Sequence, residues 1–300
     1  MLLVLDVGNT NTVLGVFAHE PPPQPLQAAP QGELVPRAVP GRFQHLAAHW
    51  RVGTVRTQTV DEYGVLFRNL FAMGGVDSKA VTGIVISSVV PPMDPTLREV
   101  CERYFGLRPL FIEPGVRTGM PVRVESPAEV GADRIVNCVA AFEKYGAPAI
   151  VVDFGTATTF DAISAKGEFL GGAIAPGLGI SADALFTRAA RLQRVEIRKP
   201  PHAIGANTVT NLQSGLYYGY LGLVDGILER MLPELGGEVK VVATGGLASL
   251  IGGGSRYIRA VDDLLTLDGL RIIWERHTGG AKPKPDHAAD GASGKKTPHS

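Results

Sequence analysis

The feature that most restricts how this chain can fold is a pair of short acidic turns that contain glycine. In the first, an apolar run at residues 2–5 precedes Asp6-Val7-Gly8-Asn9-Thr10-Asn11-Thr12, and an alternating run follows to residue 18. In the second, residues 149–152 precede Asp153-Phe154-Gly155-Thr156-Ala157-Thr158-Thr159, and another alternating run follows. Each pattern predicts a strand, a tight turn and a return strand, with one carboxylate where the first strand ends.

These turns have the chemistry that a nucleoside triphosphate requires. Glycine lets the backbone approach a phosphate, and the threonine hydroxyls and backbone N–H groups can hold phosphoryl oxygens. A carboxylate at the strand end, such as Asp6, can hold a hydrated Mg²⁺. An Asp-x-Gly turn alone is also common at ordinary strand ends. The pair, about half a chain apart, predicts two related domains that face a shared nucleotide cleft.

The remaining pattern predicts an α/β protein in which one order of elements occurs twice. In the first half we expect strands at residues 2–6, 12–18, 48–52, 81–87 and 109–112, and helices at 59–73, 96–105 and 129–145. This is the order β-β-β-α-β-α-β-α. The second half restarts with strands at 149–153, 158–164 and 167–175, later strands at 238–244 and 257–261, and helices at 179–190, 211–231, 247–251 and 264–275.

Two stretches fall outside this repeat. Residues 19–47 contain seven prolines and are expected to form an extended loop inserted at the tip of a hairpin. Residues 279–300 carry almost no large apolar side chains and are expected to be a disordered tail. We therefore expect an N-terminal domain over residues 1–147 and a C-terminal domain over 148–278.

Composition excludes several classes of protein. Hydrophobic residues make up 45% of the 300, and 29 basic residues balance 29 acidic ones, which argues against nucleic acid as the main partner. No apolar run approaches the roughly 18 residues of a membrane span, and the N-terminal run is too short for a signal peptide. Cys101 and Cys138 lack the spacing of a metal or redox motif, so we expect buried, reduced thiols. A soluble, cytoplasmic protein is expected.

Other nucleotide signatures are missing. The sequence has no Gly-x-x-x-x-Gly-Lys-[Ser/Thr] motif, and no Gly-x-Gly-x-x-Gly follows either opening strand. A third glycine turn, Ala243-Thr244-Gly245-Gly246-Leu247-Ala248, lies between an expected strand and helix. Backbone without side chains suits close contact with an adenine or a ribose, although an ordinary strand-to-helix turn also fits.

The candidate general base is Asp133, in Glu129-Val130-Gly131-Ala132-Asp133-Arg134 at the start of a predicted helix. The N–H groups of a first helical turn favour an ionised carboxylate. Such a carboxylate can accept the proton of a substrate hydroxyl as a phosphorus–oxygen bond forms. An acidic residue at this position also stabilises a helix, so a purely structural role remains an alternative.

Together these residues resemble the type III pantothenate kinases of the acetate and sugar kinase/heat-shock chaperone/actin superfamily. The resemblance runs from residue 1 to about 277 and depends on both acidic turns, on Gly131-Ala132-Asp133-Arg134, on Gly205-Ala206-Asn207-Thr208 and on Ala243-Thr244-Gly245-Gly246. It implies two tandem ribonuclease H-like (actin-like ATPase) domains. It also implies ATP-dependent phosphorylation of the primary hydroxyl of pantothenate to 4'-phosphopantothenate, the first step of coenzyme A biosynthesis.

The resemblance assigns roles to individual residues. ATP phosphates and Mg²⁺ are expected at Asp6, Val7, Gly8, Asn9, Thr10, Asn11, Thr12 and Val13, with Asp6 holding Mg²⁺ through water and Thr156 contacting the nucleotide from the other domain. Asp133 is expected to be the base, and Gly131, Ala132, Asp133 and Arg134 to bind pantothenate. Asp153 is expected to bind the monovalent cation, K⁺ or NH₄⁺. Thr208 is expected to reach pantothenate across the interface of a homodimer.

One position departs from the family pattern, and two other functions stay open. Several relatives carry a tyrosine about nine residues before the base, where this chain has Val124. Another small-molecule kinase or phosphohydrolase of the same fold is the first alternative. A non-enzymatic transcriptional accessory protein is the second, and the neutral net charge speaks against it.

Overall fold

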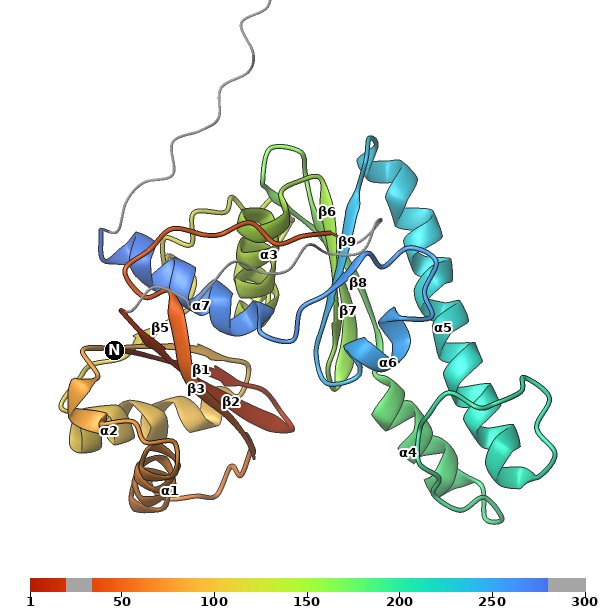
Figure 1. The fold of residues 1–300 in the computed structure, drawn as a ribbon, viewed down its shortest axis with the longest axis horizontal. Coiled ribbons are helices and arrows are strands. Elements are labelled where there is room, and N and C mark those ends of the chain that lie inside the picture. The colour runs from red at the N-terminus through yellow and green to blue at the C-terminus, as the bar shows by residue number, and fades with distance from the viewer. Residues whose placement is uncertain (20–33, 280–300) are drawn as a thin grey trace, which may run out of the picture.

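The computed structural model describes residues 1–19 and 34–279, which form two five-stranded mixed sheets with helices around them (Figure 1). The first sheet has the order β3-β2-β1-β4-β5 and the second has the order β8-β7-β6-β9-β10. In both, two antiparallel pairs are followed by two parallel ones. The predicted α/β class and the repeat of one strand arrangement in the two halves of the chain are confirmed.

The strands of the two sheets correspond one to one. The first sheet contains β1 (Leu2–Val7), β2 (Asn11–Ala18), β3 (His45–Gly53), β4 (Gly83–Ser88) and β5 (Leu110–Phe111). The second contains β6 (Ala149–Phe154), β7 (Ala157–Ile163), β8 (Phe169–Pro176), β9 (Lys240–Thr244) and β10 (Ala260–Val261). The central strands β1 and β6 share one burial pattern, because each is covered on both faces and only its acidic residue is partly exposed.

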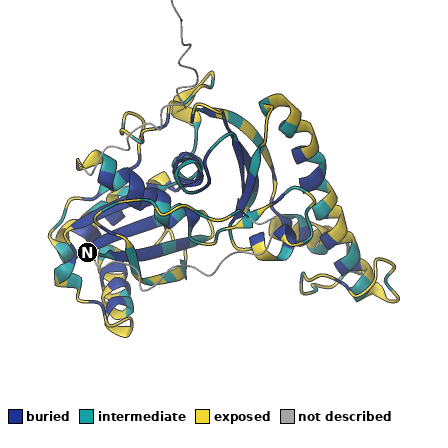
Figure 2. Ribbon diagram, turned by 45° about the horizontal axis from the view of Figure 1, so that its top comes forward, coloured by how far each residue is buried: buried dark blue, intermediate teal, exposed yellow. Residues whose placement is uncertain are grey.

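Helices cover both faces of each sheet. The helices are α1 (Val60–Met73), α2 (Asp94–Phe105), α3 (Ala132–Tyr145), α4 (Leu178–Arg188), α5 (Thr208–Leu235), α6 (Ala248–Gly252) and α7 (Leu265–His277). Helices α1 and α2 pack on one face of the first sheet, and α5 and α6 pack on one face of the second. Helices α3 and α7 lie between the two sheets, and their apolar side chains form one central core with side chains of both sheets. In Figure 2, α3 is largely dark blue, the colour of buried residues.

Helix α7 connects the end of the chain to its beginning. Although it follows the last strand of the second sheet, it packs against β1 and β4 of the first sheet and against α3. Leu2 and Val4 of β1 share one apolar cluster with Leu270 and Ile273 of α7. The faces of both sheets that would otherwise expose apolar side chains are therefore buried by two shared helices.

Local signals explain where individual elements begin. Thr59, the residue before α1, accepts a hydrogen bond from the backbone of Glu62, and the Glu62 side chain accepts one from Thr59. A capping box of this kind contributes about 1 kcal/mol to helix stability. For α5, the cap is the residue before Thr208. Asn207 caps this helix and pairs with Thr210, and Thr208 is the first helical residue.

Most differences from the predicted elements lie at their ends. Strand β3 begins three residues earlier than predicted, because β2 pairs with it across a bulge as far as His45. Helix α5 extends to Leu235 and includes Pro233. Of the predicted insertion, residues 20–33 lie outside the described residues, and 34–44 have no regular secondary structure. The predicted tail lies outside them from residue 280 onward.

The two cysteines and the length and hydropathy of the helices were also considered in the sequence. Cys101 and Cys138 are both free and buried, as predicted, and burial raises the pKa of the Cys101 thiol to about 12. No helix within residues 1–19 and 34–279 is both long and apolar enough to cross a bilayer.

Candidate active site

The first acidic turn is a tight hairpin between β1 and β2. Asp6 lies at the end of β1, beside Ser87 of the parallel strand β4. The Gly8 N–H donates to the Asn11 carbonyl at 3.0 Å, and a Cβ on Gly8 would lie 3.1 Å from that oxygen. Glycine is therefore the residue that this turn accommodates best. Asn9 and Thr10 are left exposed at the tip.

The loop after β3 supports this hairpin. The Thr54 hydroxyl donates to the Gly8 carbonyl at 2.7 Å and lies 2.9 Å from the buried hydroxyl of Thr12. Arg56 donates from Nη2 to Oδ1 of Asn9 at 2.8 Å. The tip is thus held by the loop that follows β3.

The second acidic turn repeats this arrangement between β6 and β7. Asp153 occupies the position of Asp6, and the Gly155 N–H donates to the Ala157 carbonyl at 3.0 Å. The turn is one residue shorter, since Asp153 faces Thr159 whereas Asp6 faces Val13.

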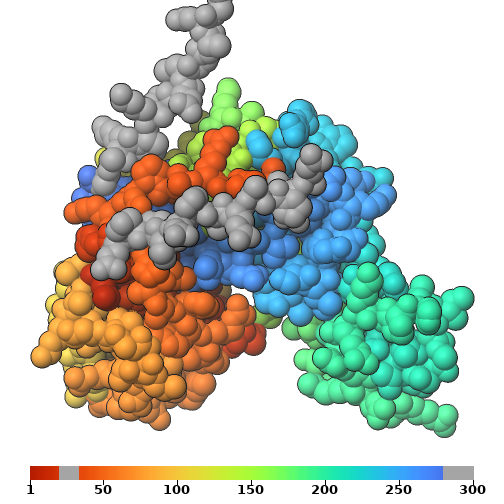
Figure 3. All heavy atoms as spheres, viewed as in Figure 1, coloured from red at the N-terminus to blue at the C-terminus, as the bar shows by residue number. Residues whose placement is uncertain are grey.

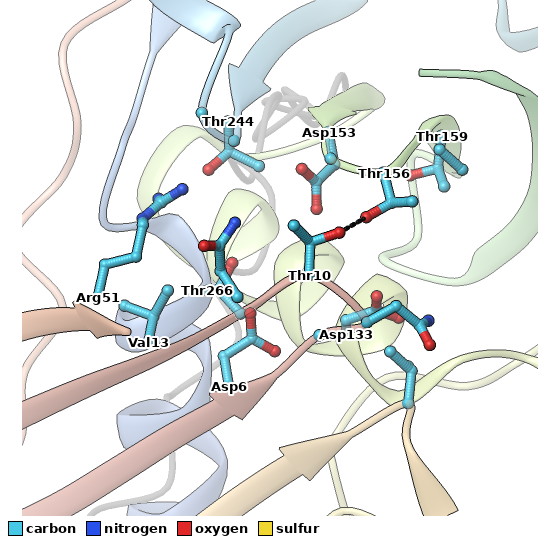
Figure 4. A pocket seen from close by; sticks show the side chains of 18 of the residues that line it. Asp6, Thr10, Val13, Arg51, Asp133, Asp153, Thr156, Thr159, Thr244 and Thr266 are labelled. Carbon is cyan, nitrogen blue, oxygen red and sulfur yellow. Dashed lines mark hydrogen bonds between the residues drawn. The ribbon is translucent and has the colours of Figure 1, made fainter. Parts of the chain in front are cut away.

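The tips of the two hairpins meet, because the hydroxyl oxygens of Thr10 and Thr156 lie 2.8 Å apart (Figure 4). In the space-filling view the first hairpin faces an open hollow, and α4 and the start of α5 project on its other side (Figure 3).

The predicted carboxylates lie in one cleft. Asp6, Asp133 and Asp153 all line it, and Figure 4 shows them arranged around the touching hairpin tips. The other lining residues come from both hairpins, from β3, from the segment after β4, from the third glycine turn, and from α7 and the loop before it: Gly8, Asn9, Thr10, Asn11, Val13, Arg51, Val89, Gly155, Thr156, Ala157, Thr159, Thr244, Gly245, Gly246, Asp263, Thr266 and Leu267. Residues from both halves of the chain therefore share one site.

Several predicted residues lie outside this lining. Val7 and Thr12 are buried beneath the first hairpin. Gly131, Ala132 and Arg134 adjoin Asp133 at the start of α3 without lining the cleft, and Thr208 is exposed at the start of α5. The idea that all three threonines of the second turn offer hydroxyls to phosphate is wrong. Thr158 points to the other face of β7 and hydrogen-bonds the Tyr220 hydroxyl.

Burial and mutual repulsion dominate the electrostatics of the acidic residues. Burial raises the pKa of Asp6 to about 8, aided by the charges of Asp133 and Asp153, while Ser87 and Arg51 oppose this rise. Burial likewise raises the pKa of Asp153 to about 7, with Asp133 adding to it. Burial also raises the pKa of Asp133, and the N–H of Arg134, which donates at 2.8 Å, opposes that shift. Ionising all three is unfavourable unless cations approach.

Asn137 and Thr266 hold Asp153, and neither residue was predicted from the sequence. Asn137 donates from Nδ2 to Oδ2 of Asp153 at 2.9 Å, and the Thr266 hydroxyl donates to Oδ1 of Asn137 at 2.7 Å. Asn137 is buried one helical turn after Asp133, on the same face of α3. This polar residue at i+4 from the predicted base, on an otherwise apolar face, is the signal that could have identified it.

Arg134 is held away from the predicted base. Its Nε and Nη2 atoms lie 2.8 Å and 2.5 Å from Oδ1 of Asp161, which is fully buried, and its guanidinium lies over the ring of Phe169. Thr159 donates to the other oxygen of Asp161 at 2.9 Å. The ion pair joins α3 to β7 and fixes the direction of the guanidinium beside the cleft.

Val124 stands where several relatives carry a tyrosine, and the structure shows what surrounds it. Val124 packs against the central core, and one of its methyl groups lies 3.4 Å from where a Cβ on Gly171 of β8 would stand. The segment before it pairs with β8 between Val122 and Phe169.

Comparisons with known proteins agree on one family. A family model described as "Type III pantothenate kinase" matches residues 2–230. A type III pantothenate kinase from Koribacter versatilis is 68% identical over 284 residues, which cover 95% of this chain and 98% of that protein. Those from Acidobacterium capsulatum and Myxococcus xanthus are 57% and 56% identical, each covering 92% of this chain and 94% and 99% of the relative.

One solved structure supports the fold. It belongs to a Campylobacter jejuni protein described as a conserved Baf family transcriptional activator, with a TM-score of 0.54 and 18% sequence identity. The match covers 92% of this chain and 98% of that one. At this identity the likeness concerns the fold alone.

Proposed function

This chain belongs to the type III pantothenate kinase family, and on that basis we propose that Asp133 is the general base of its reaction. The family activity is the ATP-dependent phosphorylation of pantothenate for coenzyme A biosynthesis. The observation that carries the proposal is that Asp6, Asp133 and Asp153 line one cleft at which the tips of the two hairpins meet.

In the proposed complex, residues 6–13 and Thr156 bind the phosphates of ATP. Asn9 and Thr10 are exposed at the tip, and among the described residues their backbone N–H groups donate to no other backbone carbonyl. They can therefore donate to an anion, and Thr156 meets Thr10 from the opposite sheet. Gly245 and Gly246 offer a wall without side chains on which the nucleoside can lie.

Two cations fit the acidic residues of the cleft. We assign Mg²⁺ to Asp6 through water, and a monovalent cation, K⁺ or NH₄⁺, to Asp153. Within the described residues no three acidic, histidine or cysteine side chains gather closely enough to ligate one ion. That geometry fits a Mg²⁺ bound mostly through water and phosphate oxygens. The raised pKa values of Asp6 and Asp153 support the assignment, because a nearby cation favours the ionised carboxylate.

The proposed reaction is a direct transfer. The primary hydroxyl of pantothenate attacks the terminal phosphorus of ATP while Asp133 accepts the hydroxyl proton. The new phosphorus–oxygen bond forms as the bond between the terminal phosphorus and the oxygen that bridges it to ADP breaks. ADP leaves with the electron pair of the broken bond. Mg²⁺, when bound, neutralises charge on the phosphates. Asp133 is suited to this step because it is held at the start of a helix. Its pKa is raised, which moves that pKa closer to neutral pH.

Pantothenate is assigned to the start of α3, at Gly131, Ala132, Asp133 and Arg134, with Thr208 supplied by a second subunit. Thr208 does not line the cleft of its own chain, which supports a role in a partner's cleft. Close to Thr208 in the chain, the side chain of Ile204 is 90% exposed. A Cβ added at Gly215, Gly219 or Gly222 on α5 would meet no heavy atom within 4 Å among the described residues outside its own stretch of helix, so a second α5 can approach closely. We therefore propose a homodimer.

The remaining parts of the proposal concern organisation and location. We place the domain boundary between residues 147 and 148, so that each domain contains one sheet, and the tail from 279. The two free, buried cysteines and the use of ATP support a cytoplasmic location. Neither nucleic acid nor a membrane is proposed as a partner, in keeping with a net charge of zero.

A substrate screen tests the function directly. The purified chain is incubated with Mg·ATP, K⁺ and one acceptor at a time from a panel of vitamins and sugars, and products are identified by mass spectrometry. We expect phosphopantothenate and no comparable product from the other acceptors. Preferred phosphorylation of a sugar would support the alternative small-molecule kinase, and no phosphorylated product with any acceptor would contradict the enzyme assignment.

A further inference from the structure

The cleft continues beyond the three carboxylates into a second hollow. Val13, His49, Arg51, Gly245, Gly246, Ser249, Asp263 and Leu264 line this outer hollow. Five of these residues also line the inner cleft: Val13, Arg51, Gly245, Gly246 and Asp263. Arg51 is the cationic side chain shared by the two, so it stands where the inner cleft opens into the outer hollow.

Strand pairing directs Arg51 into the cleft. It faces Val13 across the β2–β3 pair, while its neighbours Trp50 and Val52 turn to the opposite face and pack in the core of the first sheet. Its Nη1 atom lies 3.2 Å from where a Cβ on Gly246 would stand. Figure 4 shows its guanidinium extending above Val13 toward Thr244. An arginine of the first sheet thus reaches a turn of the second.

Among the described residues, the guanidinium of Arg51 has no anionic partner. Within residues 1–19 and 34–279, no carboxylate lies within 4.0 Å of it, and it donates no side-chain hydrogen bond. Arg56, the next arginine along the chain, differs because its guanidinium is already bonded to Asn9 and does not line the cleft. A planar guanidinium that faces an open cleft is well suited to bind phosphate through two parallel hydrogen bonds.

The positions of Asp133, Arg51 and the outer hollow along the cleft indicate which part of ATP Arg51 can contact. The transferred phosphoryl group must lie beside Asp133, at the inner end, because the base acts there. The nucleoside then extends outward over Gly245 and Gly246 into the hollow of His49 and Ser249. Arg51 stands between these two ends. This order depends on the placement of ATP proposed above.

We propose that Arg51 binds the diphosphate part of ATP and stabilises the negative charge that develops on ADP as the bond to the transferred phosphoryl group breaks. In this role it is a catalytic residue that acts on the leaving group, whereas Asp133 acts on the attacking hydroxyl. Because the charge on the leaving oxygen is greatest in the transition state, the interaction lowers the barrier as well as aiding binding.

The test compares Arg51→Ala and Arg51→Lys with wild type, using Arg68→Ala as the matched control. Arg68 is an exposed arginine on α1 and does not line the cleft. We expect Arg51→Ala to lower kcat/KM for ATP by about 10²- to 10³-fold, with kcat reduced and KM for pantothenate unchanged. Arg51→Lys should retain an intermediate rate, because lysine keeps the charge but loses the planar fork. Arg68→Ala should match wild type.

Two further measurements separate a catalytic role from a structural one. Guanidinium ion added to Arg51→Ala at millimolar concentration should restore part of kcat, whereas the same concentration of Na⁺ should not. Calorimetry should show weaker ADP binding in Arg51→Ala. If Arg51→Ala turns over like wild type, or if ADP affinity is unchanged and guanidinium rescues nothing, the proposal is overturned. If wild type itself binds no ADP, the proposed nucleotide site fails first, and this inference fails with it.

Discussion

The side-chain amide of Asn137 lies 2.9 Å from Oδ2 of Asp153, and this contact holds the carboxylate proposed to bind the monovalent cation. The amide itself is oriented, since the Thr266 hydroxyl donates to its oxygen at 2.7 Å. Three elements therefore determine the direction of one carboxylate: β6 carries it, α3 donates to it and α7 orients the donor. Asp153 is thus left with its other oxygen for the cleft.

We predict that this chain of hydrogen bonds controls the response to K⁺. Wild type should be activated by K⁺ over Na⁺ at equal ionic strength, and Asp153→Ala should lose that preference. Thr266→Val should raise the K⁺ concentration for half-activation several-fold and lower the free energy of unfolding by about 1 kcal/mol, because one hydrogen bond to a buried amide is lost. Initial rates across a KCl series and urea unfolding measure both effects. Equal activity of wild type in the two salts would argue against the cation role of Asp153.

Asp133→Asn should abolish phosphoryl transfer while leaving nucleotide binding intact. Loss of a positioned general base lowers kcat by about 10²- to 10⁴-fold, whereas ATP is bound elsewhere by the hairpins. The matched control is Asp61→Asn, because Asp61 is also the second residue of a helix, α1, but lies exposed and outside the cleft. A coupled ADP-release assay and calorimetry with ATP measure the two properties. Near-normal turnover of Asp133→Asn would contradict its assignment as the base.

The raised pKa of Asp6 predicts a stability that falls with rising pH. Its carboxyl group keeps its proton in the folded protein up to about pH 8, whereas an unperturbed group with a pKa of 3.8 has released it. Between about pH 4 and pH 8 the folded state therefore binds more protons, so the free energy of unfolding decreases as pH rises.

Asp6→Asn removes this linkage, so its Tm at pH 8 without Mg²⁺ should exceed that of wild type by about 3 °C or more, with a smaller difference at pH 5. Thermal unfolding across the pH range measures both, and Asp61→Asn should follow the wild-type curve. Parallel curves for wild type and Asp6→Asn would mean that Asp6 does not carry the raised pKa.

The proposed homodimer predicts complementation between two inactive variants. If Thr208 serves the cleft of the partner, a mixed dimer of Asp133→Asn and Thr208→Val contains one site with both native residues. After the two proteins are mixed, unfolded and refolded together, about one quarter of the wild-type activity should return, since half of the dimers are mixed and each has one working site. Each variant refolded alone is the control. No recovery would place Thr208 in the cleft of its own chain or outside any cleft.

Local sequence patterns were sufficient to predict most of the elements. Both hairpins, the ten strands and the seven helices fall within a few residues of their predicted positions, because apolar periodicity and capping residues act over short distances. The same local patterns placed Asp6 and Asp153 at the ends of the two central strands and Asp133 in the first turn of α3. That they lie in one cleft was predicted from the repeat of the two acidic turns.

The sequence alone determined the two repeated sheets and the identity of the three cleft carboxylates, because these depend on residue order within short segments. Only the tertiary structure decided what surrounds those carboxylates. Arg51 of β3 and Thr266 of α7 line the cleft, and Asn137 of α3 donates to Asp153, because of how strands pair and helices pack. Thr158 and Thr159 differ in the same way, since adjacent residues of a strand point to opposite faces. Direction across a packed interface depends on neighbours distant in sequence, which no local pattern contains.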